Sequence, residues 1–483
     1  IFSRPAGAKV FLNEKMVGMT PLESGLNGGV YSLRVTADNY VDSIDKFEIT
    51  HAESNVKRNY QLARIKAKVI PKLTPKGGRL IVNGSLSKGP FFLSTNVEHR
   101  LVYMKHGYYP STKKIQLSSD KEKEISFQLK PEFGKVKISS SPPATIWIDN
   151  KNYGNNAITV SLPAVTQQIV FKKKGHRSVS KTINPTGKFV QKISAKLLTE
   201  YQARLQESPR ELTNKDGIKL KLFINPGNLK MGAPRSQNGQ RANEFQKRIR
   251  LTKSFYASIF EITNGQYGKF KPSLKKSLGA DNIPVTSIDW NEAASFCNWL
   301  SKNEGLQLFY KIVNGRVNGF NKNTDGYRLL SEAEWEWLSR MAGKTKQTIF
   351  SWGDEMIIPP NAANVSDEGA KGQMKFYVPN YNDGYVSAAP VGSFKEEPSG
   401  LYDIAGNVSE WVHDIYSIMP PMEDTISENP LGAENGSSHV VKGANFRSGS
   451  ITILRPSFRE GLTTGRDDVG FRVGRYLYGG KNE

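Results

Sequence analysis

Residues 400–414, GLYDIAGNVSEWVHD, are the most distinctive segment of this 483-residue chain. They lie in its aromatic-rich part, because six of the seven tryptophans follow Leu220. This concentration predicts one large core in the carboxy-terminal part of the chain. Eight other strings occur in order with this segment: KMGAP (230–234), FEITNGQYGKF (260–270), IPVTSIDWNEAASFCNWLS (283–301), YRLLSEAEWEWLSRMAG (327–343), FSWGDE (350–355), NAAN (361–364), VVKGANFRSG (440–449) and VGFRVGR (469–475).

Taken together and in order, these strings resemble the formylglycine-generating enzyme family, also called the sulfatase-modifying factor family. The resemblance covers about residues 218–477. It implies the family's fold, a mixed α+β variant of the C-type lectin fold with few regular elements and many ordered loops. We therefore predict a domain of this kind over residues 216–483.

Two of the strings predict helices from their capping residues. Ser331 followed by Glu334 fits a capping box, and Asn291 is a suitable residue to cap an earlier helix. Glu332, Glu334 and Glu336 could suggest a pair of catalytic carboxylates. A cap and a solvent-exposed helix face explain them more simply, and we adopt that interpretation.

The cysteine content conflicts with the chemistry of the family. As the resemblance implies, its oxidases bind copper through two cysteines that follow a segment matching residues 443–446 here. Ser448 and Ile453 occupy the two thiol positions, and Cys297 is the only cysteine of the chain. Cu(I) requires soft thiolate ligands, so we predict no catalytic residues and no copper. Cys297 lies among apolar helix positions and is predicted to be a core thiol.

The histidines do not provide the other metal site known in this family. A sister branch, the sulfoxide synthases, holds iron with three histidines. Of the six histidines in this chain, only His413 and His439 lie in the predicted domain. We therefore predict no iron, and no enzyme activity by a known mechanism of the family.

Calcium is the one cofactor that the resemblance supports. The family carries structural calcium sites built from carboxylates and backbone carbonyls, and such hard oxygen donors suit Ca²⁺. We expect weak binding, on the order of 10⁻⁴–10⁻³ M; the alternative is that these acids only cap turns. The matching positions are Asn364, Val365, Asp383 and Tyr385 at the first site, and Asp403, Gly406, Val408 and Glu410 at the second.

Four arginines near the carboxy-terminal strings are candidates for an anion-binding groove, which an enzyme or a binding protein could use. The alternative is that they form structural ion pairs with Asp467, Asp468 or Glu460. The four candidates are Arg447, Arg455, Arg459 and Arg472.

The first 200 residues contain an internal repeat. Tyr40, Tyr108 and His176 are spaced 68 residues apart, and a fixed period with short alternating strands predicts copies of one small β-sandwich. A turn signal precedes an alternating strand in each copy: RPAG (4–7), TPKGG (74–78) and SPPA (141–144).

These copies resemble the PEGA domain, a small β unit. We predict a multidomain chain with three all-β sandwich repeats, of which the second and third are degenerate, followed by the α+β domain. An alternative is a set of unrelated immunoglobulin-like strands. The predicted boundaries are 1–63, 64–131 and 132–198 for the repeats, 199–215 for a helical linker and 216–483 for the last domain.

Positive charge is concentrated in the repeats. Residues 1–200 hold 32 Lys and Arg against 14 Asp and Glu, whereas residues 201–483 hold 35 against 31. A basic array of this kind suits an anionic envelope polymer, although a solvated surface without a partner is the simpler alternative. Nucleic acid is disfavoured, because no base-stacking or groove-entering element accompanies the charge.

The sequence begins directly on a predicted strand, without a secretory signal or an apolar run long enough to span a bilayer. One interpretation is that a signal or membrane anchor lies upstream of Ile1. PEGA repeats are generally found outside the cytoplasm, so the resemblance implies an extracytoplasmic protein, either periplasmic or membrane-anchored and facing the periplasm.

Intact scaffold motifs without the catalytic thiols predict a non-catalytic binding or regulatory protein with a protein partner. By analogy with cysteine-less family members, type VI secretion or envelope signalling is the expected context. The alternatives are an enzyme with an unrecognised mechanism and an envelope structural protein that binds anionic polymer.

Overall fold

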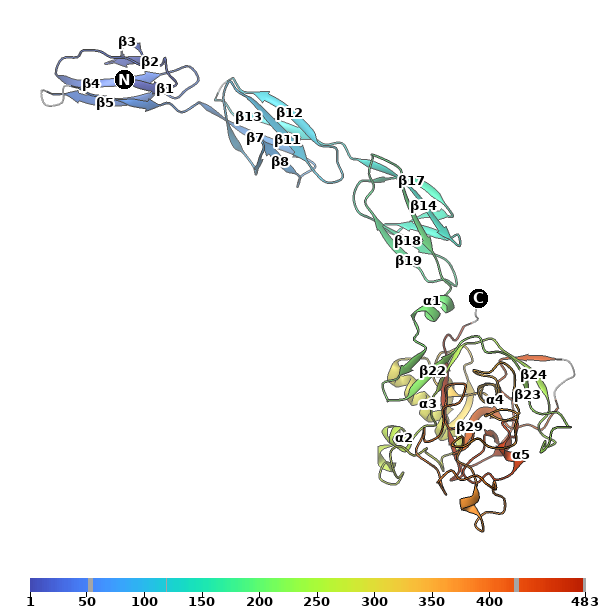
Figure 1. Cartoon of the computed structure of the whole chain (residues 1–483). Helices are drawn as coiled ribbons and strands as arrows, with labels where there is room; N and C mark the ends of the chain where they lie inside the picture. Colours follow the sequence, from blue (N-terminus) through green and yellow to red (C-terminus); the bar gives the residue numbers. More distant parts are fainter. Residues whose placement is uncertain (51–54, 119, 421–424, 481–483) are drawn as a thin grey trace. The chain divides into compact units, whose positions relative to one another are not determined.

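The computed structural model describes residues 1–50, 55–118, 120–420 and 425–480. The chain divides into two compact units, residues 1–197 and 198–483 (Figure 1). Every regular element described in the first unit is a strand, and the second mixes short strands, helices and long loops. The predicted order of fold classes, all-β repeats followed by an α+β domain, is confirmed. Within the described ranges, no helix has the length and apolar composition needed to cross a bilayer.

The first unit consists of three successive β groups, each with its own buried apolar cluster. In every group the first and last strands pair in parallel, as β1 with β6, β7 with β13 and β14 with β20. A four-stranded antiparallel sheet completes each group, in the orders β3-β2-β4-β5, β12-β11-β8-β9 and β16-β15-β18-β19. The second and third groups have the same topology, and their remaining sheets are β10-β7-β13 and β17-β14-β20.

The strands of the first unit are short, which is usual for small sandwiches. Group one contains β1 Phe2–Arg4, β2 Lys9–Leu12, β3 Lys15–Met19, β4 Gly29–Thr36, β5 Ser43–Ile49 and β6 Asn59–Gln61. Group two contains β7 Lys66–Thr74, β8 Arg79–Val82, β9 Ser85–Ser87, β10 Phe91–Ser94, β11 Glu98–Met104, β12 Ser111–Gln116 and β13 Lys123–Gln128. Group three contains β14 Phe133–Ser141, β15 Thr145–Ile148, β16 Lys151–Asn155, β17 Ile158–Pro163, β18 Gln167–Lys172, β19 Val179–Ile183 and β20 Gln191–Lys196.

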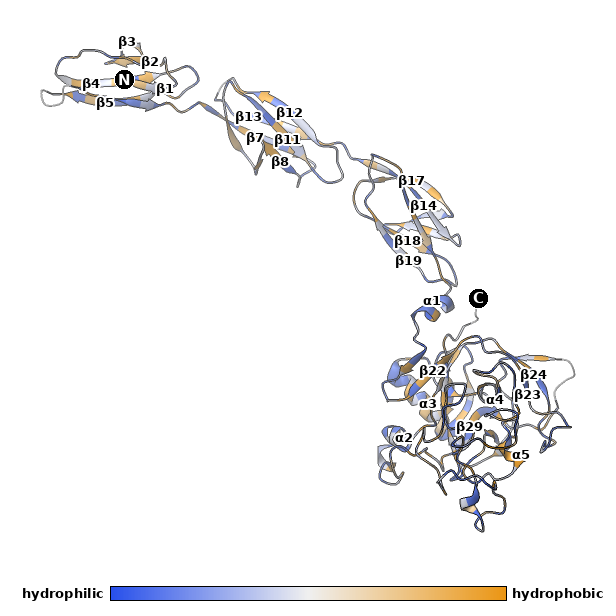
Figure 2. Cartoon of the chain, viewed as in Figure 1, coloured by the Kyte–Doolittle hydropathy of each residue, from blue (hydrophilic) through white to orange (hydrophobic). Residues whose placement is uncertain are grey.

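Alternation along these strands explains why they form two-layer sandwiches. In β14, Val136 and Ile138 are buried, whereas Lys135 and Lys137, which alternate with them, are exposed. Successive side chains of a strand point to opposite faces, so one face packs inward and the other carries charge. Figure 2 shows the resulting mixture of hydrophobic and hydrophilic colours along the strands of each group.

The second unit is organised around one large apolar cluster that includes Trp290, Trp335 and Trp411. Its main sheets have the orders β21-β22-β25-β34-β28 and β32-β31-β29-β33, with smaller sheets β23-β24-β30 and β26-β27. The strands are β21 Glu211–Thr213, β22 Lys219–Phe223, β23 Gly227–Met231, β24 Lys247–Leu251, β25 Phe255–Ser258, β26 Tyr310–Val313, β27 Arg316–Phe320, β28 Arg328–Leu329, β29 Ser409–Ile415, β30 Ile426–Glu428, β31 His439–Lys442, β32 Glu460–Leu462, β33 Val469–Phe471 and β34 Val473–Tyr476. The helices are α1 Glu200–Glu207, α2 Asn264–Phe270, α3 Trp290–Glu304, α4 Glu332–Arg340 and α5 Ile451–Leu454, with 3₁₀ turns η1 Pro272–Leu274 and η2 Glu368–Ala370.

The segment expected to be a helical linker forms α1 and then β21, and both belong to the second unit. Thr199 caps α1 through a capping box with Gln202. Arg204 then ties the helix to the unit by an ion pair with Asp325 at 2.5 Å and a hydrogen bond to the carbonyl of Leu477.

Helix α3 begins earlier than its sequence suggested. Asp289 is the N-cap and forms a capping box with Glu292, so the predicted cap at Asn291 is wrong. The Asn291 side chain instead accepts a hydrogen bond from the backbone N–H of Val317. Cys297 on this helix is fully buried in the core, as predicted.

Candidate functional site

The segment that follows β31 contains Ser448 and Ile453, the two positions that the resemblance matches to the thiols of the family's oxidases. Ser448 is buried, and its hydroxyl accepts from the backbone N–H of Asn445 at 3.0 Å and donates to the Asn445 side chain at 3.1 Å. Ile453 lies on the short helix α5 and is half-buried. A hydroxyl held inside a turn and a branched alkane offer no soft ligand to Cu(I).

The only thiol of the chain lies elsewhere, on α3. Cys297 has no exposed surface, and burial raises the pKa of its thiol far above the ordinary value. Because the thiolate is the form that reacts with electrophiles and binds metals, Cys297 has the properties of a core residue.

Three of the four candidate groove arginines form buried ion pairs with carboxylates. Their guanidinium groups are at most 7% exposed. Each contacts its partner through two nitrogens at 2.6–2.9 Å, the geometry of strong charge-assisted pairs. Guanidiniums that are buried and paired in this way are not exposed to bind an external anion. The pairs are Arg455–Glu244, Arg459–Glu332 and Arg472–Glu410.

Arg447 is the exposed member of the four. It forms two hydrogen bonds of 2.6 Å with Asp467, and the side chains are 41% and 60% exposed. This is the structural pairing that the sequence offered as an alternative. Arg466, which was not among the candidates, pairs with the other two predicted carboxylates, Glu460 and Asp468.

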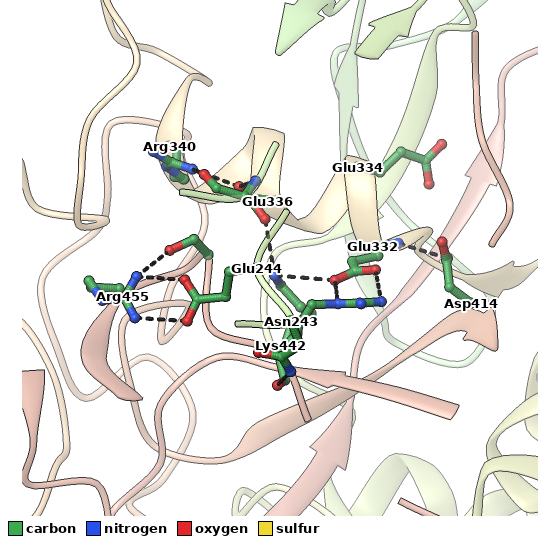
Figure 3. A network of polar contacts seen from close by, with 12 residues as sticks. Asn243, Glu244, Glu332, Glu334, Glu336, Arg340, Asp414, Lys442 and Arg455 are labelled. Carbon is green, nitrogen blue, oxygen red and sulfur yellow. Dashed lines mark hydrogen bonds and ion pairs between the residues drawn. The ribbon is translucent and has the colours of Figure 1, made fainter. Parts of the chain in front are cut away.

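The glutamates of α4 form a buried network (Figure 3). The capping box of Ser331 and Glu334 is confirmed, but the solvent-exposed face predicted for these glutamates is wrong, because Glu332, Glu334 and Glu336 are at most 3% exposed. Burial of a carboxylate requires a partner of opposite charge. Two of the cations come from distant segments and two from within six residues of the glutamate that they contact. The partners are Arg459 and Lys442 for Glu332, Arg328 for Glu334, and Arg340 and Lys442 for Glu336.

The residues predicted for the first calcium site lie together. The side chain of Asp383 accepts backbone hydrogen bonds from Val365 and Tyr385, both at 2.8 Å, and burial raises its pKa to about 6. Asn364 is buried, and no described residue donates to its side-chain oxygen. An unpartnered amide oxygen near a carboxylate and loop carbonyls is a donor set that fits Ca²⁺.

The second predicted site contains a pair of buried carboxylates. Asp403 and Glu261 each have one side-chain oxygen that receives no hydrogen bond from the described residues. Burial raises the pKa of both groups, to about 6 for Asp403, and the negative charge of Asp403 raises that of Glu261 further. These two carboxylates, each with a free oxygen, fit a cation. The predicted ligand Glu410 does not add a free oxygen of this kind, because its carboxylate already accepts hydrogen bonds from Arg472 and Trp335.

Asn407 connects the two predicted calcium sites. Its side chain accepts a hydrogen bond from Asn364 at 3.2 Å and donates one to Glu261 at 3.3 Å. Gly406 beside it packs so closely that a Cβ atom would lie 2.3 Å from the carbonyl oxygen of Asn364. The predicted ligand Val408 is also buried here. Within the described residues, no three His, Cys, Asp or Glu side chains are grouped to hold a metal, so calcium would need amide and main-chain oxygens in addition to the carboxylates.

Sequence reasoning missed Glu261, although it lies within the quoted string FEITNGQYGKF. It also missed Glu244 and Lys442. In each case the sequence shows a charged residue inside an apolar or turn-rich segment. Such a residue could have indicated a buried charge, because a buried charge requires a partner.

The second unit also has an open groove of about 600 Å³ along α3 and β26. Trp299 and Phe270 supply aromatic surface, with ring centroids 5.8 Å apart, and Lys302 and Lys311 supply positive charge. None of the lining residues is an acid, a histidine or a cysteine. The groove is lined by Phe270, Ser295, Asn298, Trp299, Lys302, Leu308, Tyr310, Lys311, Ile312 and Asn321.

Comparisons with known proteins agree with these observations. The family model described as "Sulfatase-modifying factor enzyme 1-like domain" matches residues 206–477, and the PEGA domain model matches residues 1–66 and 133–200. The resemblance of the second unit is confirmed, and the PEGA resemblance is confirmed for the first and third groups; the second group, which the PEGA model does not match, shares the topology of the third.

Two curated mouse proteins are similar to part of the chain. One is named formylglycine-generating enzyme; it is 31% identical over 170 residues, which are 35% of this chain and 37% of that protein. The other is named inactive C-alpha-formylglycine-generating enzyme 2; it is 29% identical over 198 residues, which are 39% of this chain and 48% of that protein. The chain therefore spans less than half the length of these relatives.

Among solved structures, that of Treponema denticola variable protein 1 is 20% identical, with a TM-score of 0.44, and it covers 56% of this chain and 99% of that protein. The family model itself spans more than half of the 483 residues. The chain belongs to the sulfatase-modifying factor enzyme 1-like family.

Proposed function

We propose that this protein is a non-catalytic binding or regulatory protein whose sulfatase-modifying-factor-like unit recognises a protein or ligand outside the cytoplasm. The observation that carries the proposal is the chemistry at the two thiol positions. Ser448 is buried in its own turn and Ile453 has an alkane side chain, so neither can hold the copper of the family's oxidases. The mouse relative named inactive supports the existence of non-catalytic members.

The open groove of the second unit supports recognition rather than catalysis. A catalytic site needs a convergent set of acid, base, nucleophile or electrophile, and the residues that line this groove include no such set. Aromatic and amide side chains beside two lysines are instead typical of a binding surface. The buried pairing of Arg455, Arg459 and Arg472 likewise counts against an enzyme with an unrecognised mechanism in an arginine-lined pocket.

Calcium is proposed as a structural ion. At the first site Asn364, Asp383 and the carbonyls of Val365 and Tyr385 would hold it, and at the second site Asp403 and Glu261 would take part. When bound, the ion would neutralise buried carboxylates and stiffen loops that lack strand hydrogen bonds. We further propose a periplasmic or membrane-anchored location and a role in type VI secretion or envelope signalling, which rest on the family analogy alone.

The decisive test is an aldehyde assay with the full chain. A cysteine-containing peptide is incubated in air with Cu(I), and the product is detected with a hydrazide probe and by mass spectrometry. A formylglycine-generating enzyme serves as the positive control. We expect no aldehyde, and formation of aldehyde by this chain would overturn the proposal.

A second test addresses recognition by the groove. Crosslinking to envelope components is compared between the wild-type chain, a Trp299→Ala/Lys302→Glu variant and a Lys395→Glu control, whose lysine is exposed outside the groove. We expect the groove variant to lose a crosslinked partner that the control retains. Equal crosslinking by all three chains would remove the groove from the proposal.

A further inference from the structure

The third β group has almost no acid to neutralise its positive charge. Residues 133–197 contain ten lysines and one acid, Asp149, and one oxygen of that carboxylate accepts a hydrogen bond from the backbone of Gln168. The second group is also basic, but its glutamates Glu98, Glu122 and Glu124 each pair with a lysine. The third group therefore presents the least compensated positive surface of the first unit.

An open groove of about 790 Å³ lies on this group, at the end of the sheet β16-β15-β18-β19. Ile146 and Ile148 of β15 are buried, so the alternate residues Thr145 and Trp147 point to the outer face. The groove is lined by Pro143, Ala144, Thr145, Trp147, Asn152, Asn155, Asn156, Lys172, Lys173, Lys174 and Ser178.

The strand register places aromatic, amide and cationic groups side by side in this groove. Thr145 is paired with Asn155 on one side and with Lys172 on the other, and Trp147 is paired with Asn152. The ammonium nitrogen of Lys172 lies 4.9 Å from the centre of the Trp147 ring. An anion that pairs with Lys172 is therefore brought against the indole.

The asparagines add donors rather than acceptors. The side-chain oxygen of Asn155 accepts from the hydroxyl of Thr145 at 2.6 Å, and that of Asn152 accepts from the backbone of Gly154 at 2.7 Å. Each amide nitrogen still carries two N–H donors, and both residues are exposed. A ligand rich in oxygen acceptors would pair with these ammonium and amide donors around the Trp147 indole.

We propose that this groove binds an acidic polysaccharide. The lysines would pair with its charged groups, the asparagine amides with its hydroxyls, and the indole with the apolar face of a sugar ring. This narrows the anionic-polymer prediction for the repeats to one site. The inference does not depend on the role proposed for the second unit, because it concerns residues of the first unit only.

Two other polyanions fit the groove less well. Single-stranded nucleic acid stacks successive bases on several aromatic side chains, whereas Trp147 is the only aromatic residue in the lining. A membrane surface would need apolar side chains beside the lysines. Phe189 and Val190 are exposed, but they follow Thr186, which packs against Gly134 at the start of β14. The end of β14 next to the groove is about 23 Å from Gly134 along the strand.

The test is calorimetric titration of the full chain with oligogalacturonate at physiological salt, with neutral dextran, polyphosphate and single-stranded DNA as comparison ligands. We expect binding of oligogalacturonate and none of dextran. Trp147→Ala should weaken oligogalacturonate binding by about tenfold, the range of one aromatic contact, and Trp147→Tyr should restore most of it. Polyphosphate binding, which depends on charge alone, should not change in Trp147→Ala.

The matched control removes equal charge at Lys188 and Lys192, near the start and the middle of β14 and outside the groove lining. Lys172→Gln/Lys174→Gln should weaken binding strongly, whereas Lys188→Gln/Lys192→Gln should leave it within about twofold, as for remote surface charges. Thermal unfolding verifies that each variant is folded. The proposal is overturned if the two lysine double variants weaken oligogalacturonate binding equally. It is also overturned if Trp147→Ala and Trp147→Tyr both bind oligogalacturonate as the wild type does, or if single-stranded DNA binds more tightly than the glycan.

Discussion

Arg472 and Glu410 form an ion pair that is closed off from solvent. The nitrogen Nη2 of Arg472 lies 2.7 Å from Oε1 of Glu410, and Nε lies 2.8 Å from Oε2; both side chains are 1% exposed. The remaining donors of Arg472 reach the carbonyls of Ser258, Ile259 and Tyr402. One side chain thus connects the end of β25, the loop before β29 and the segment joining β33 to β34.

Substitution Arg472→Met should destabilise the second unit strongly. It leaves the Glu410 carboxylate buried without a partner, which costs about 3–5 kcal/mol in comparable pairs. The measurement is denaturant unfolding of the second unit. Arg447→Met is the matched control, because its pair with Asp467 is exposed and should contribute at most about 1 kcal/mol. Equal losses in the two variants would contradict the structural role of burial.

Calcium should raise the thermal stability of the second unit. For a dissociation constant on the order of 10⁻⁴–10⁻³ M, about 10 mM calcium stabilises the folded state by about 1.4–2.7 kcal/mol per site. The measurement is the unfolding temperature in calcium and in a chelator.

Two variants separate the predicted calcium sites. Asp383→Asn should remove the calcium-dependent increment of the first site, and Asp403→Asn that of the second. Asp467→Asn, an exposed acid paired with Arg447, should keep the full increment. If the unfolding temperature of the wild-type chain is the same in calcium and in chelator, both sites should be abandoned.

His413 should make the second unit sensitive to acid. Burial first, and the nearby charge of Arg328 second, lower its pKa to about 3. The unfolded chain binds a proton near pH 6.5 and the native state does not, so stability falls as pH drops from about 6.5 toward 3, by about 1.4 kcal/mol per pH unit. His439 shifts in the same direction, to about 4.

The contribution of His413 is isolated by comparing variants at two pH values. The deficit of His413→Gln relative to wild type should shrink by about 2 kcal/mol between pH 7 and pH 5. The same comparison for the exposed His106 should show no change. A deficit of His413→Gln that is independent of pH would mean that the pKa of His413 is the same in the native and unfolded states.

Helix α4 shows what its sequence could and could not predict. The capping box of Ser331 and Glu334 was predicted because it depends on residues three apart in the chain. The partners of Glu332 were not, because Arg459 and Lys442 lie more than one hundred residues away. A local pattern cannot distinguish a solvated acid from a buried one whose cation comes from another segment.

The same reasoning applies to the larger architecture. The 68-residue period predicted the repeats because each group builds its own core from nearby strands. The sequence identified only part of the residues now proposed to hold calcium, since Glu261, which the charge of Asp403 affects, lies in a segment 142 residues earlier. The two grooves were not predicted at all, because a concave surface arises from packing and strand register.

Cys297 should be unreactive in the folded protein. It has no exposed surface, and burial raises the pKa of its thiol, so both access and thiolate are lacking. Iodoacetamide should label it only after denaturation, as followed by mass spectrometry. Labelling of the native chain at the rate of a free thiol would show that the core around α3 opens, and it would reopen the question of thiol chemistry.

Lys442 offers the sharpest test of the buried network (Figure 3). Its side chain has no exposed surface, and its ammonium lies 3.0 Å from Glu336 and 3.6 Å from Glu332. Lys442→Met should destabilise the second unit by about 3–5 kcal/mol, because it leaves an excess of buried negative charge. Adding Glu336→Gln should recover part of that loss, because the double variant removes both partners of the 3.0 Å pair. The double-mutant cycle then measures the coupling energy between Lys442 and Glu336. Strictly additive losses would mean that Lys442 acts by packing alone, and that the charges of α4 are balanced by the arginines without it.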